Sequence, residues 1–382
     1  MTLNQLVARN VFRNTRRSLL TVLSITFSLL LLTVMMTIWR SFYIDPGPRD
    51  SSLRLITRHR VSLAFFLPGY YREKIRAVPG VTRVVPMTYF GGRYKDDRPE
   101  NFFVQFATDP AEYIDVAADR ILPKEQVKAW QQDRTGCLVD VALAKRHGWK
   151  LGDHVHLRGT IFPVDLDLTI RGIFTVDPPS NSLYFNSAYL EESVSFAKGQ
   201  AGFYFIRTSS PEAVNRAGKA IDDLFRNSPR PTRTESEQVF RLGMIAQLGN
   251  VKAFILSIAG AVVFAILLVC ANTMAMSIRE RTREVAVLKA LGFTSSQVLR
   301  LFVEESVTLC LAGGVAGVLA AAVLLHAVGF GGAIGVPSSI RVTFPTMLAA
   351  IAVALLVGLA STFIPSYQAT HRNIVEGLRH IG

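Results

Sequence analysis

The chain has 382 residues, of which 49% are hydrophobic, and it carries a formal net charge of +13. With a mean hydropathy of +0.29, this composition is too apolar for an ordinary soluble protein. No nucleic-acid recognition motif accompanies the basic excess, so we attribute it to anionic lipid headgroups and do not expect a nucleic-acid partner. Three cysteines are too few for a disulfide framework.

The first predicted elements are an amphipathic helix and a membrane span. Residues 1–17 place apolar and arginine side chains on different helical faces, which favours a cytoplasmic helix in the membrane interface; the cytoplasmic end of a longer first span is the alternative. Residues 18–40 follow as the first span. A secretory signal is disfavoured because the apolar stretch is too long for its h-region and no small-residue cleavage site follows.

A large extracytoplasmic α+β domain is predicted for residues 41–245, as two subdomains. Apolar patterning predicts strands at 81–90, 101–107, 154–159, 166–174 and 202–208, and helices at 110–120, 124–133, 140–149 and 211–227. From residue 235 a helical pattern runs into the second span. We therefore expect a continuous helical stalk between the domain and the membrane.

Three further spans complete a membrane protein of four transmembrane helices. They are residues 252–278, 303–328 and 344–366, each longer than the roughly 20 helical residues that cross a bilayer. Lys and Arg gather in residues 1–17 and 279–300, whereas the loop 329–343 has Arg341 alone. The positive-inside rule then makes both termini cytoplasmic, including the tail 367–382, and the loop 329–343 external.

The segment 279–300, between the second and third spans, is rich in charge. Its charged side chains before the turn are Arg279, Glu280, Arg281, Arg283, Glu284 and Lys289. Each would cost roughly 2.5–3.5 kcal/mol at the bilayer centre, so the segment is predicted to be a cytoplasmic elbow. Spacings of three predict surface pairs between Arg281 and Glu284 and between Glu280 and Arg283.

Local signals predict a helix–turn–helix in this elbow. Gly292 fits a helix C-terminus, and Thr294 with Gln297 fits a capping box that opens the next helix. The apolar residues of one side are Val285, Leu288, Leu291 and Phe293. This side has no lipid to face, so it needs a partner. A solvated linker between two spans is the alternative interpretation.

Four stretches carry a family resemblance. They are ARNVFRNTRRSLLTVLSI (8–25), residues 140–159, residues 272–321 through two spans and the elbow, and IPSYQATHRNIVEGLR (364–379). Together and in this order they resemble the FtsX/MacB-type permeases of ABC transporters, the superfamily of macrolide exporters and lipoprotein-release permeases. The resemblance implies an extracytoplasmic part like the MacB periplasmic core and a location in the bacterial plasma (inner) membrane.

The resemblance also implies partners and coupling residues. Four-span protomers would pair, as homodimer or heterodimer, and bind a separate ABC ATPase subunit, with a membrane-fusion or adaptor protein as a further partner. The residues carried over for ATPase coupling are Glu280, Arg281, Thr282, Arg283, Glu284, Leu288, Gly292, Glu376 and Arg379. Glu304 and Glu305, at the cytoplasmic start of the third span, are open between coupling and a simple interface position.

Other motifs are weaker. His154 and His156 would share a strand face but have no evident third metal ligand, and the pair Asp165 and Asp167 is equally incomplete. His326 has no evident catalytic partner. The glycines Gly313, Gly314 and Gly317 suit close helix packing, either within the bundle or between protomers. Because the histidine and aspartate groups are incomplete, no catalytic, metal or cofactor site is expected. No G-x-x-x-x-G-K-[ST] motif occurs either, so ATP hydrolysis is assigned to another subunit.

The sequence thus predicts an ABC-type permease that transmits the ATPase cycle mechanically to export or extraction of an amphiphile at the outer face. The alternative is an FtsX-like mechanical regulator that controls an envelope enzyme without transport. A membrane-embedded enzyme is disfavoured because no catalytic constellation is evident.

Overall fold

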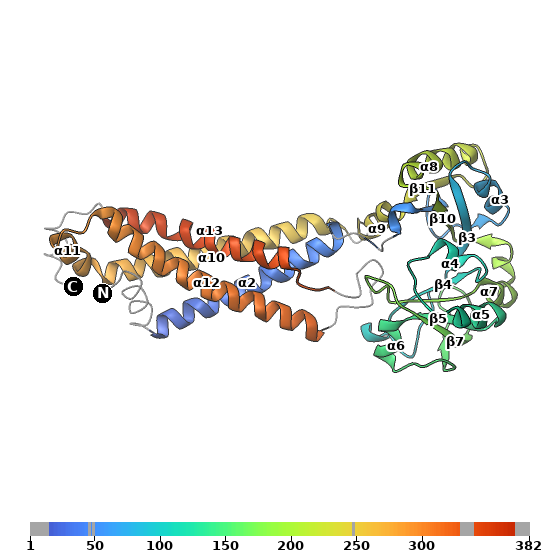
Figure 1. Cartoon of the computed structure of the whole chain (residues 1–382), viewed down its shortest axis with the longest axis horizontal. Coiled ribbons are helices and arrows are strands. Elements are labelled where there is room, and N and C mark those ends of the chain that lie inside the picture. The colour runs from blue at the N-terminus through green and yellow to red at the C-terminus, as the bar shows by residue number, and fades with distance from the viewer. Residues whose placement is uncertain (1–14, 45–46, 48–49, 247–248, 329–339, 371–382) are drawn as a thin grey trace. The chain divides into compact units, whose positions relative to one another are not determined.

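The computed structural model describes residues 15–44, 47, 50–246, 249–328 and 340–370, which divide into a helical unit and an external domain (Figure 1). Four helices in this part of the chain are long and apolar enough to cross a membrane. The external domain is inserted between the first and the second of them. The predicted fold class, four spans with a large α/β domain after the first, is confirmed.

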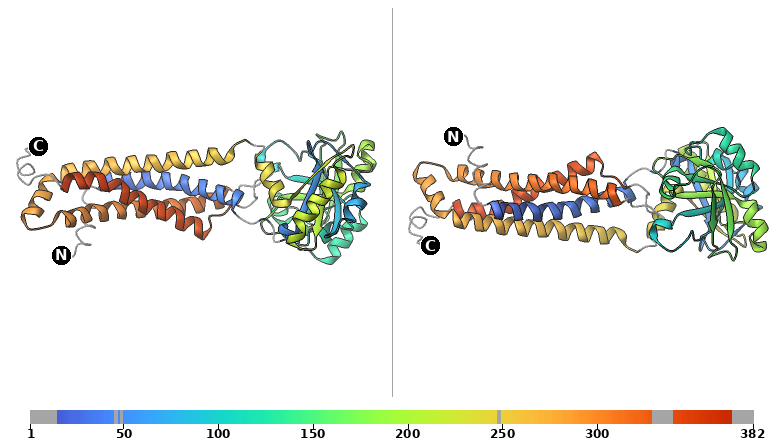
Figure 2. Two further views of the ribbon diagram at one scale, coloured as in Figure 1. Left: turned by 90° about the horizontal axis from the view of Figure 1, so that it is seen from above. Right: turned by 90° about the horizontal axis from the view of Figure 1, so that it is seen from below.

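The four long helices run alongside one another in both views of Figure 2. They are α2 (Thr15–Tyr43), α10 (Val251–Glu280), α12 (Ser295–Val328) and α13 (Phe344–Thr370), and a short helix, α11 (Thr282–Ala290), lies between α10 and α12. A long uncharged apolar run must be helical in lipid, because only the helix satisfies all its backbone hydrogen bonds internally.

A narrow apolar core holds the four-helix bundle together. Its buried residues are Ile25, Leu29, Leu32, Ile266, Cys270, Cys310, Ala354 and Val357. The sulfur atoms of Cys270 and Cys310 lie 3.6 Å apart in this core. Large apolar side chains such as Phe27 and Phe264 point away from the bundle, as expected for helices that present much of their surface to lipid.

The external domain is built on one nine-stranded sheet in the order β11-β1-β10-β3-β4-β8-β5-β7-β6, with a separate β2-β9 pair. The pairs β4–β8 and β5–β7 are parallel, and the other neighbours are antiparallel. The strands are β1 (Arg54–His59), β2 (Leu67–Pro68), β3 (Val81–Tyr89), β4 (Val104–Thr108), β5 (Gly136–Asp140), β6 (His154–Leu157), β7 (Leu166–Phe174), β8 (Ser182–Asn186), β9 (Gln200–Ala201), β10 (Phe203–Thr208) and β11 (Thr232–Ser236).

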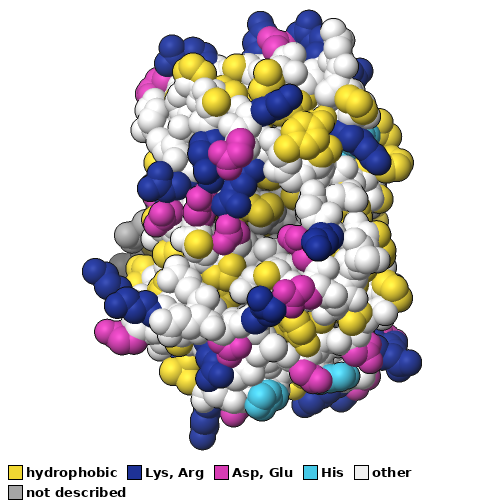
Figure 3. Space-filling model, turned by 90° about the vertical axis from the view of Figure 1, so that its right-hand side faces the viewer, with side chains coloured by type: hydrophobic (Ala, Val, Ile, Leu, Met, Phe, Trp, Pro, Cys, Tyr) yellow, Lys and Arg dark blue, Asp and Glu magenta, His cyan; other side chains and the backbone are white. Residues whose placement is uncertain are grey.

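Helices cover this sheet and divide its core into three apolar clusters. The helices are α3 (Tyr71–Arg76), α4 (Tyr113–Val116), α5 (Lys124–Gln132), α6 (Val141–His147), α7 (Ser187–Ser193), α8 (Pro211–Phe225) and α9 (Glu237–Ala246), with 3-10 turns at Ser51–Leu53, Pro99–Asn101 and Ser195–Ala197. On the face drawn in Figure 3, acidic and basic side chains are interspersed among apolar ones.

The predicted continuous stalk is wrong. The helical pattern from residue 235 becomes the end of β11 and then α9, which ends at Ala246, and α10 begins afresh at Val251. Gly249 has φ +98°, a conformation that favours glycine and ends a helix. The Asn250 side chain then accepts a hydrogen bond from the Ala253 N–H at 3.1 Å and caps α10. α9 and α10 are therefore separate helices.

Candidate functional site: the helical elbow

The elbow begins where α10 ends. Helix α10 continues past its apolar stretch to Glu280, and Arg281 then leaves helical geometry with φ −104° and ψ 13° before α11 starts at Thr282. The predicted helix after the second span is thus a separate short helix. α11 lies at one end of the bundle, between the ends of α10 and α12 (Figure 1).

Backbone hydrogen bonds show how the elbow turns. Gly292 has φ +94°, its N–H donates to the Lys289 carbonyl at 3.0 Å, and the Phe293 N–H donates to the Leu288 carbonyl at 3.0 Å. This pair of bonds is the Schellman arrangement that ends a helix at a left-handed glycine. The prediction of a helix end at Gly292 is confirmed.

The next helix opens with the predicted capping box. The Thr294 N–H donates to Gln297 Oε1 at 2.9 Å, and the Gln297 N–H donates to Thr294 Oγ1 at 3.3 Å. Each side chain satisfies a backbone donor that has no partner in the first turn of a helix. The turn between α11 and α12 is therefore encoded locally by residues 292–297.

The apolar side of the elbow, which was predicted to need a partner, is largely covered by its own chain. Met274, Ile278, Val285, Val298 and Phe302 form a buried cluster, and Leu288 and Phe293 pack against it. The ends of α10 and α12 extend beyond the apolar stretches and enclose α11 between them. Sequence spacing along α11 could not reveal this tertiary contact.

What stays exposed is the outer surface of α11. Leu291 is 73% exposed and Val287 46% exposed. Glu280 is exposed and Glu284 half-buried. Two side chains carried over with them, Thr282 and Arg283, and the tail residues Glu376 and Arg379 lie outside what the structure describes; the backbone of Thr282 and Arg283 is the first turn of α11.

Arg281 is a buried residue, whereas sequence spacing placed it in a surface pair with Glu284. Its Nη1 donates to Glu305 Oε2 at 2.7 Å, and the two side chains are only 9% and 6% exposed. Glu304, by contrast, accepts from the exposed Arg300 one helical turn away on α12. The two adjacent glutamates therefore differ: Glu305 joins the α10–α11 junction to α12, and Glu304 makes a surface contact.

The three glycines of α12 lie against neighbouring helices of the same chain. A Cβ at Gly313 would come within 2.7 Å of Ile25, and one at Gly317 within 2.7 Å of the Thr26 carbonyl oxygen; both neighbours belong to α2. A Cβ at Gly314 would lie 3.0 Å from Ala354 of α13. The sequence left open whether these glycines pack within the bundle or between protomers. In the structure they pack within the bundle.

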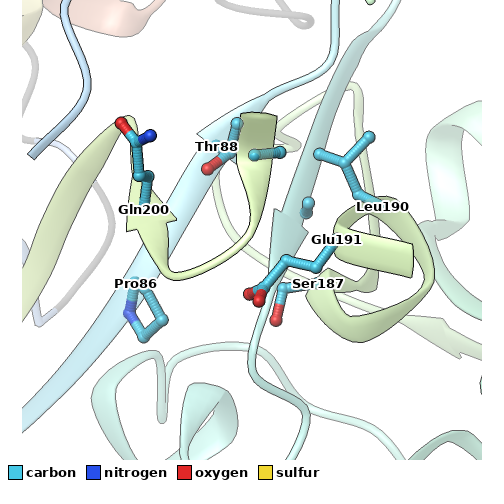
Figure 4. A pocket seen from close by; sticks show the side chains of 8 residues that line it. Pro86, Thr88, Ser187, Leu190, Glu191 and Gln200 are labelled. Carbon is cyan, nitrogen blue, oxygen red and sulfur yellow. The ribbon is translucent and has the colours of Figure 1, made fainter. Parts of the chain in front are cut away.

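The paired histidines and carboxylates of the external domain do not assemble a metal centre among the described residues. His156 hydrogen-bonds Asp167 on the neighbouring strand at 2.8 Å, but no group of three or more potential ligands is assembled in the described ranges. A small surface pocket, of about 10 Å³, has room for about one water molecule (Figure 4). Its Glu191 carboxylate already accepts from the Gly199 N–H.

Sequence reasoning missed a buried ionic cluster in this domain. Arg54, at the start of β1, is fully buried; its Nε donates to Glu237 Oε2 at 2.6 Å, and its Nη1 and Nη2 donate to the two oxygens of Asp119 at 2.5 and 3.1 Å. Although burial opposes its charge, Glu237 and Asp119 raise the pKa of Arg54. The only sequence signal was an arginine at the start of an apolar strand.

Comparison with known proteins places this architecture in a family. Residues 18–224 match the MacB-like periplasmic core domain, and residues 256–374 match the FtsX-like permease C-terminal family. The chain therefore belongs to the FtsX/MacB-type permeases of ABC transporters, as the sequence motifs predicted. It is a multi-pass membrane protein of that class.

Particular relatives are similar over parts of the chain. The uncharacterized ABC transporter permease YknZ of Bacillus subtilis is 30% identical over 60% of this chain and 57% of its own length. The macrolide export ATP-binding/permease protein MacB of Rhodopirellula baltica is 29% identical over 46% of this chain but only 26% of its own. The periplasmic region of MacB from Actinobacillus actinomycetemcomitans superposes with a TM-score of 0.39 at 13% identity, covering 51% of this chain and 94% of that structure.

Proposed function

We propose that the chain is the membrane-spanning subunit of an ABC exporter, that a separate ATPase subunit binds its elbow, and that the chain itself hydrolyses no ATP. Family membership supports the permease role, and the relatives include proteins named as export permeases. Both termini and the elbow would lie in the cytoplasm, because Lys and Arg are concentrated there rather than in the loop 329–343. Two protomers would assemble in the membrane, one for each ATPase.

The exposed surface of α11 carries the docking proposal. Leu291 and Val287 remain open to solvent after the elbow has covered its other apolar side chains. Their spacing of four residues puts them on one helical face, and Glu284 and Lys289 belong to the same helix. An exposed apolar pair with charged residues nearby in the sequence suits the centre of a small protein–protein contact. The proposed docking surface, centred on Val287 and Leu291, is thus smaller than the apolar side predicted from sequence. Leu288 does not belong to it, because Leu288 packs against the buried cluster beneath α11.

The construction of the elbow suits transmission of movement. The apolar cluster and the Arg281–Glu305 ion pair attach α11 to the ends of both α10 and α12. A displacement of α11 by the ATPase would therefore move the two spans together. Because only residues 247–250 separate the end of α9 from the start of α10 in the chain, that movement would reach the external domain, where an amphiphilic substrate is exported or extracted at the outer face.

Copurification with the candidate ATPase tests the docking surface. We expect the double variant Val287→Asp/Leu291→Asp to lose the ATPase while the permease still folds, because both side chains are exposed. The matched control is Leu151→Asp, at an apolar residue 51% exposed in the external domain, which should retain the complex. If the double variant copurifies as the parent does, the elbow is not the docking surface.

Labelling tests the orientation of the elbow. Ser296, in the first turn of α12, is exposed. A Ser296→Cys variant should react with a membrane-impermeant maleimide only when the cytoplasmic side is accessible. Reaction from outside intact cells would reverse the proposed topology.

Movement of a substrate distinguishes export from the regulatory alternative. ATP-dependent movement of an amphiphile by the purified complex supports export. Activation of a hydrolase without such movement contradicts export.

A further inference from the structure

The external domain contains a chain of buried hydrogen bonds that starts at helix α9. The carboxylate of Glu237, the first residue of α9, accepts a hydrogen bond from Arg54 Nε. The two Nη atoms of Arg54 donate to the two carboxylate oxygens of Asp119. Asp119 lies in the turn after α4 and also accepts from Arg120 Nη1 at 3.3 Å. One guanidinium thus connects the first strand after span one, the helix that precedes span two, and the α4 turn.

The chain continues across the sheet through Arg120. Its Nη2 donates to Tyr184 Oη at 2.9 Å on β8, and its guanidinium lies over the rings of Tyr113 and Tyr184 at 5.3 and 5.1 Å. The Tyr184 and Ser182 hydroxyls lie 3.1 Å apart and the Ser182 and Ser180 hydroxyls 2.6 Å apart, both within hydrogen-bond distance. Because each hydroxyl has one proton, the unbroken arrangement is the one in which Tyr184 donates to Ser182 and Ser182 donates to Ser180. The connection has now passed from β1 to β8, four positions along the sheet order.

The far end of the chain is the first turn of α6. The Ser180 hydroxyl and N–H both donate to Asp140 Oδ2, at 2.9 and 2.6 Å. The other oxygen of Asp140 accepts from the Ala142 N–H at 2.8 Å and so caps α6. An uninterrupted set of side-chain hydrogen bonds therefore joins the N-terminus of α9 to the N-terminus of α6.

Buried ion pairs are by themselves weak evidence for stability. Burying charges costs desolvation energy that pairing repays only when every polar atom is satisfied, and well-packed apolar residues are often as stable. What distinguishes this set is its extent, because its hydrogen bonds run without a gap from α9 to α6. A contiguous set of this kind, unlike an isolated pair, can transmit a displacement.

We propose that this chain, which we call the α9–α6 relay, couples the position of α9 to the N-terminus of α6 across the external domain. The relay comprises Glu237, Arg54, Asp119, Arg120, Tyr184, Ser182, Ser180 and Asp140. A displacement of α9 displaces the Arg54 guanidinium, which is bonded to Glu237. Because Arg54 makes two hydrogen bonds to Asp119, the turn after α4 moves with it. Arg120, in the same turn, then displaces β8 and, through the serine hydroxyls, the N-terminus of α6. These are positioning residues. The inference rests on the proposed function only in that span two moves α9.

Amide hydrogen exchange of the full chain in nanodiscs tests the relay without any ATPase, so loss of ATPase docking leaves this test intact. Glu237→Gln keeps the shape of the side chain but removes its charge. We expect it to speed exchange in α6 by about fivefold or more, the lower end of typical coupling between sites. The matched control is Glu235→Gln, two residues earlier, whose carboxylate pairs with Arg58 and Arg233 outside the relay. It should alter exchange only in β1 and β11.

A second variant cuts the relay in the middle. Ser182→Ala removes the hydroxyl between Tyr184 and Ser180, a small change that leaves the ionic cluster in place. In that background, adding Glu237→Gln should no longer speed exchange in α6. The relay is refuted if Glu237→Gln leaves α6 unchanged, if Glu235→Gln speeds α6 equally, or if the full effect persists in the Ser182→Ala background.

Discussion

The buried ion pair of the elbow permits a quantitative test. Arg281→Met would leave the Glu305 carboxylate, 6% exposed, without its guanidinium partner. Removing one member of a buried pair costs about 3–5 kcal/mol, whereas replacing both members with apolar residues is often neutral or stabilising. We therefore expect Arg281→Met to destabilise the closed elbow by about 3 kcal/mol or more and Arg281→Met/Glu305→Leu to recover most of that loss.

The assay is hydrogen exchange of the α11 amides, because a chain with two units does not unfold as one transition. A loss of about 3 kcal/mol corresponds to about a hundredfold increase in the open population of α11. Arg300→Met is the matched control: its pair with Glu304 is 73% and 29% exposed, so its loss should cost only about 0.3–0.5 kcal/mol, or about twofold. The predicted role of the buried pair is refuted if Arg281→Met and Arg300→Met increase α11 exchange equally. It is also refuted if Arg281→Met/Glu305→Leu leaves α11 as unstable as Arg281→Met alone.

Three further predictions concern close helix contacts, a half-buried imidazole and a left-handed glycine. Gly317→Val should destabilise the four-helix bundle by about 1–3 kcal/mol, measured as faster amide exchange in α12, because a Cβ there meets the α2 backbone within 2.7 Å. Gly260→Val, with no neighbour within 4 Å, should not. Burial and nearby cations lower the pKa of His147, so the unfolded domain binds more protons below about pH 6.5 and the stability of the external domain falls there. His147→Gln should reduce the rise in amide exchange of that domain between about pH 7.5 and 5.5, after correction for the intrinsic exchange rate, and an unchanged rise would contradict the prediction. Gly292→Ala should destabilise α11 by about 1–2 kcal/mol, measured as faster amide exchange there, while Gly243→Ala, which has open space around it, leaves α11 unaffected.

Local signals in the sequence predicted some parts of the external domain and missed others. Strands β3, β6 and β7 alternate or carry long apolar runs, and they lie where the pattern placed them. Strands β5 and β8 were missed because they are short and buried at nearly every position, so that no alternation is visible. The predicted helix at 110–120 shrinks to α4, four residues long, and Ala117 leaves helical geometry with φ −107° and ψ 52°.

By itself, the sequence determined the class of the protein and the local geometry of its elbow. Four uncharged apolar runs admit only membrane-spanning helices, and Gly292, Thr294 and Gln297 end one helix and begin the next through bonds within a few residues. Only the tertiary structure decided which side chains face a partner. It covered Leu288 with α10 and α12, exposed Leu291, paired Arg281 with Glu305, and buried Arg54 between Asp119 and Glu237. The ion pairs among these contacts join residues 24 to 183 positions apart, and hydrophobic periodicity, which reports only on near neighbours, carries no information about them.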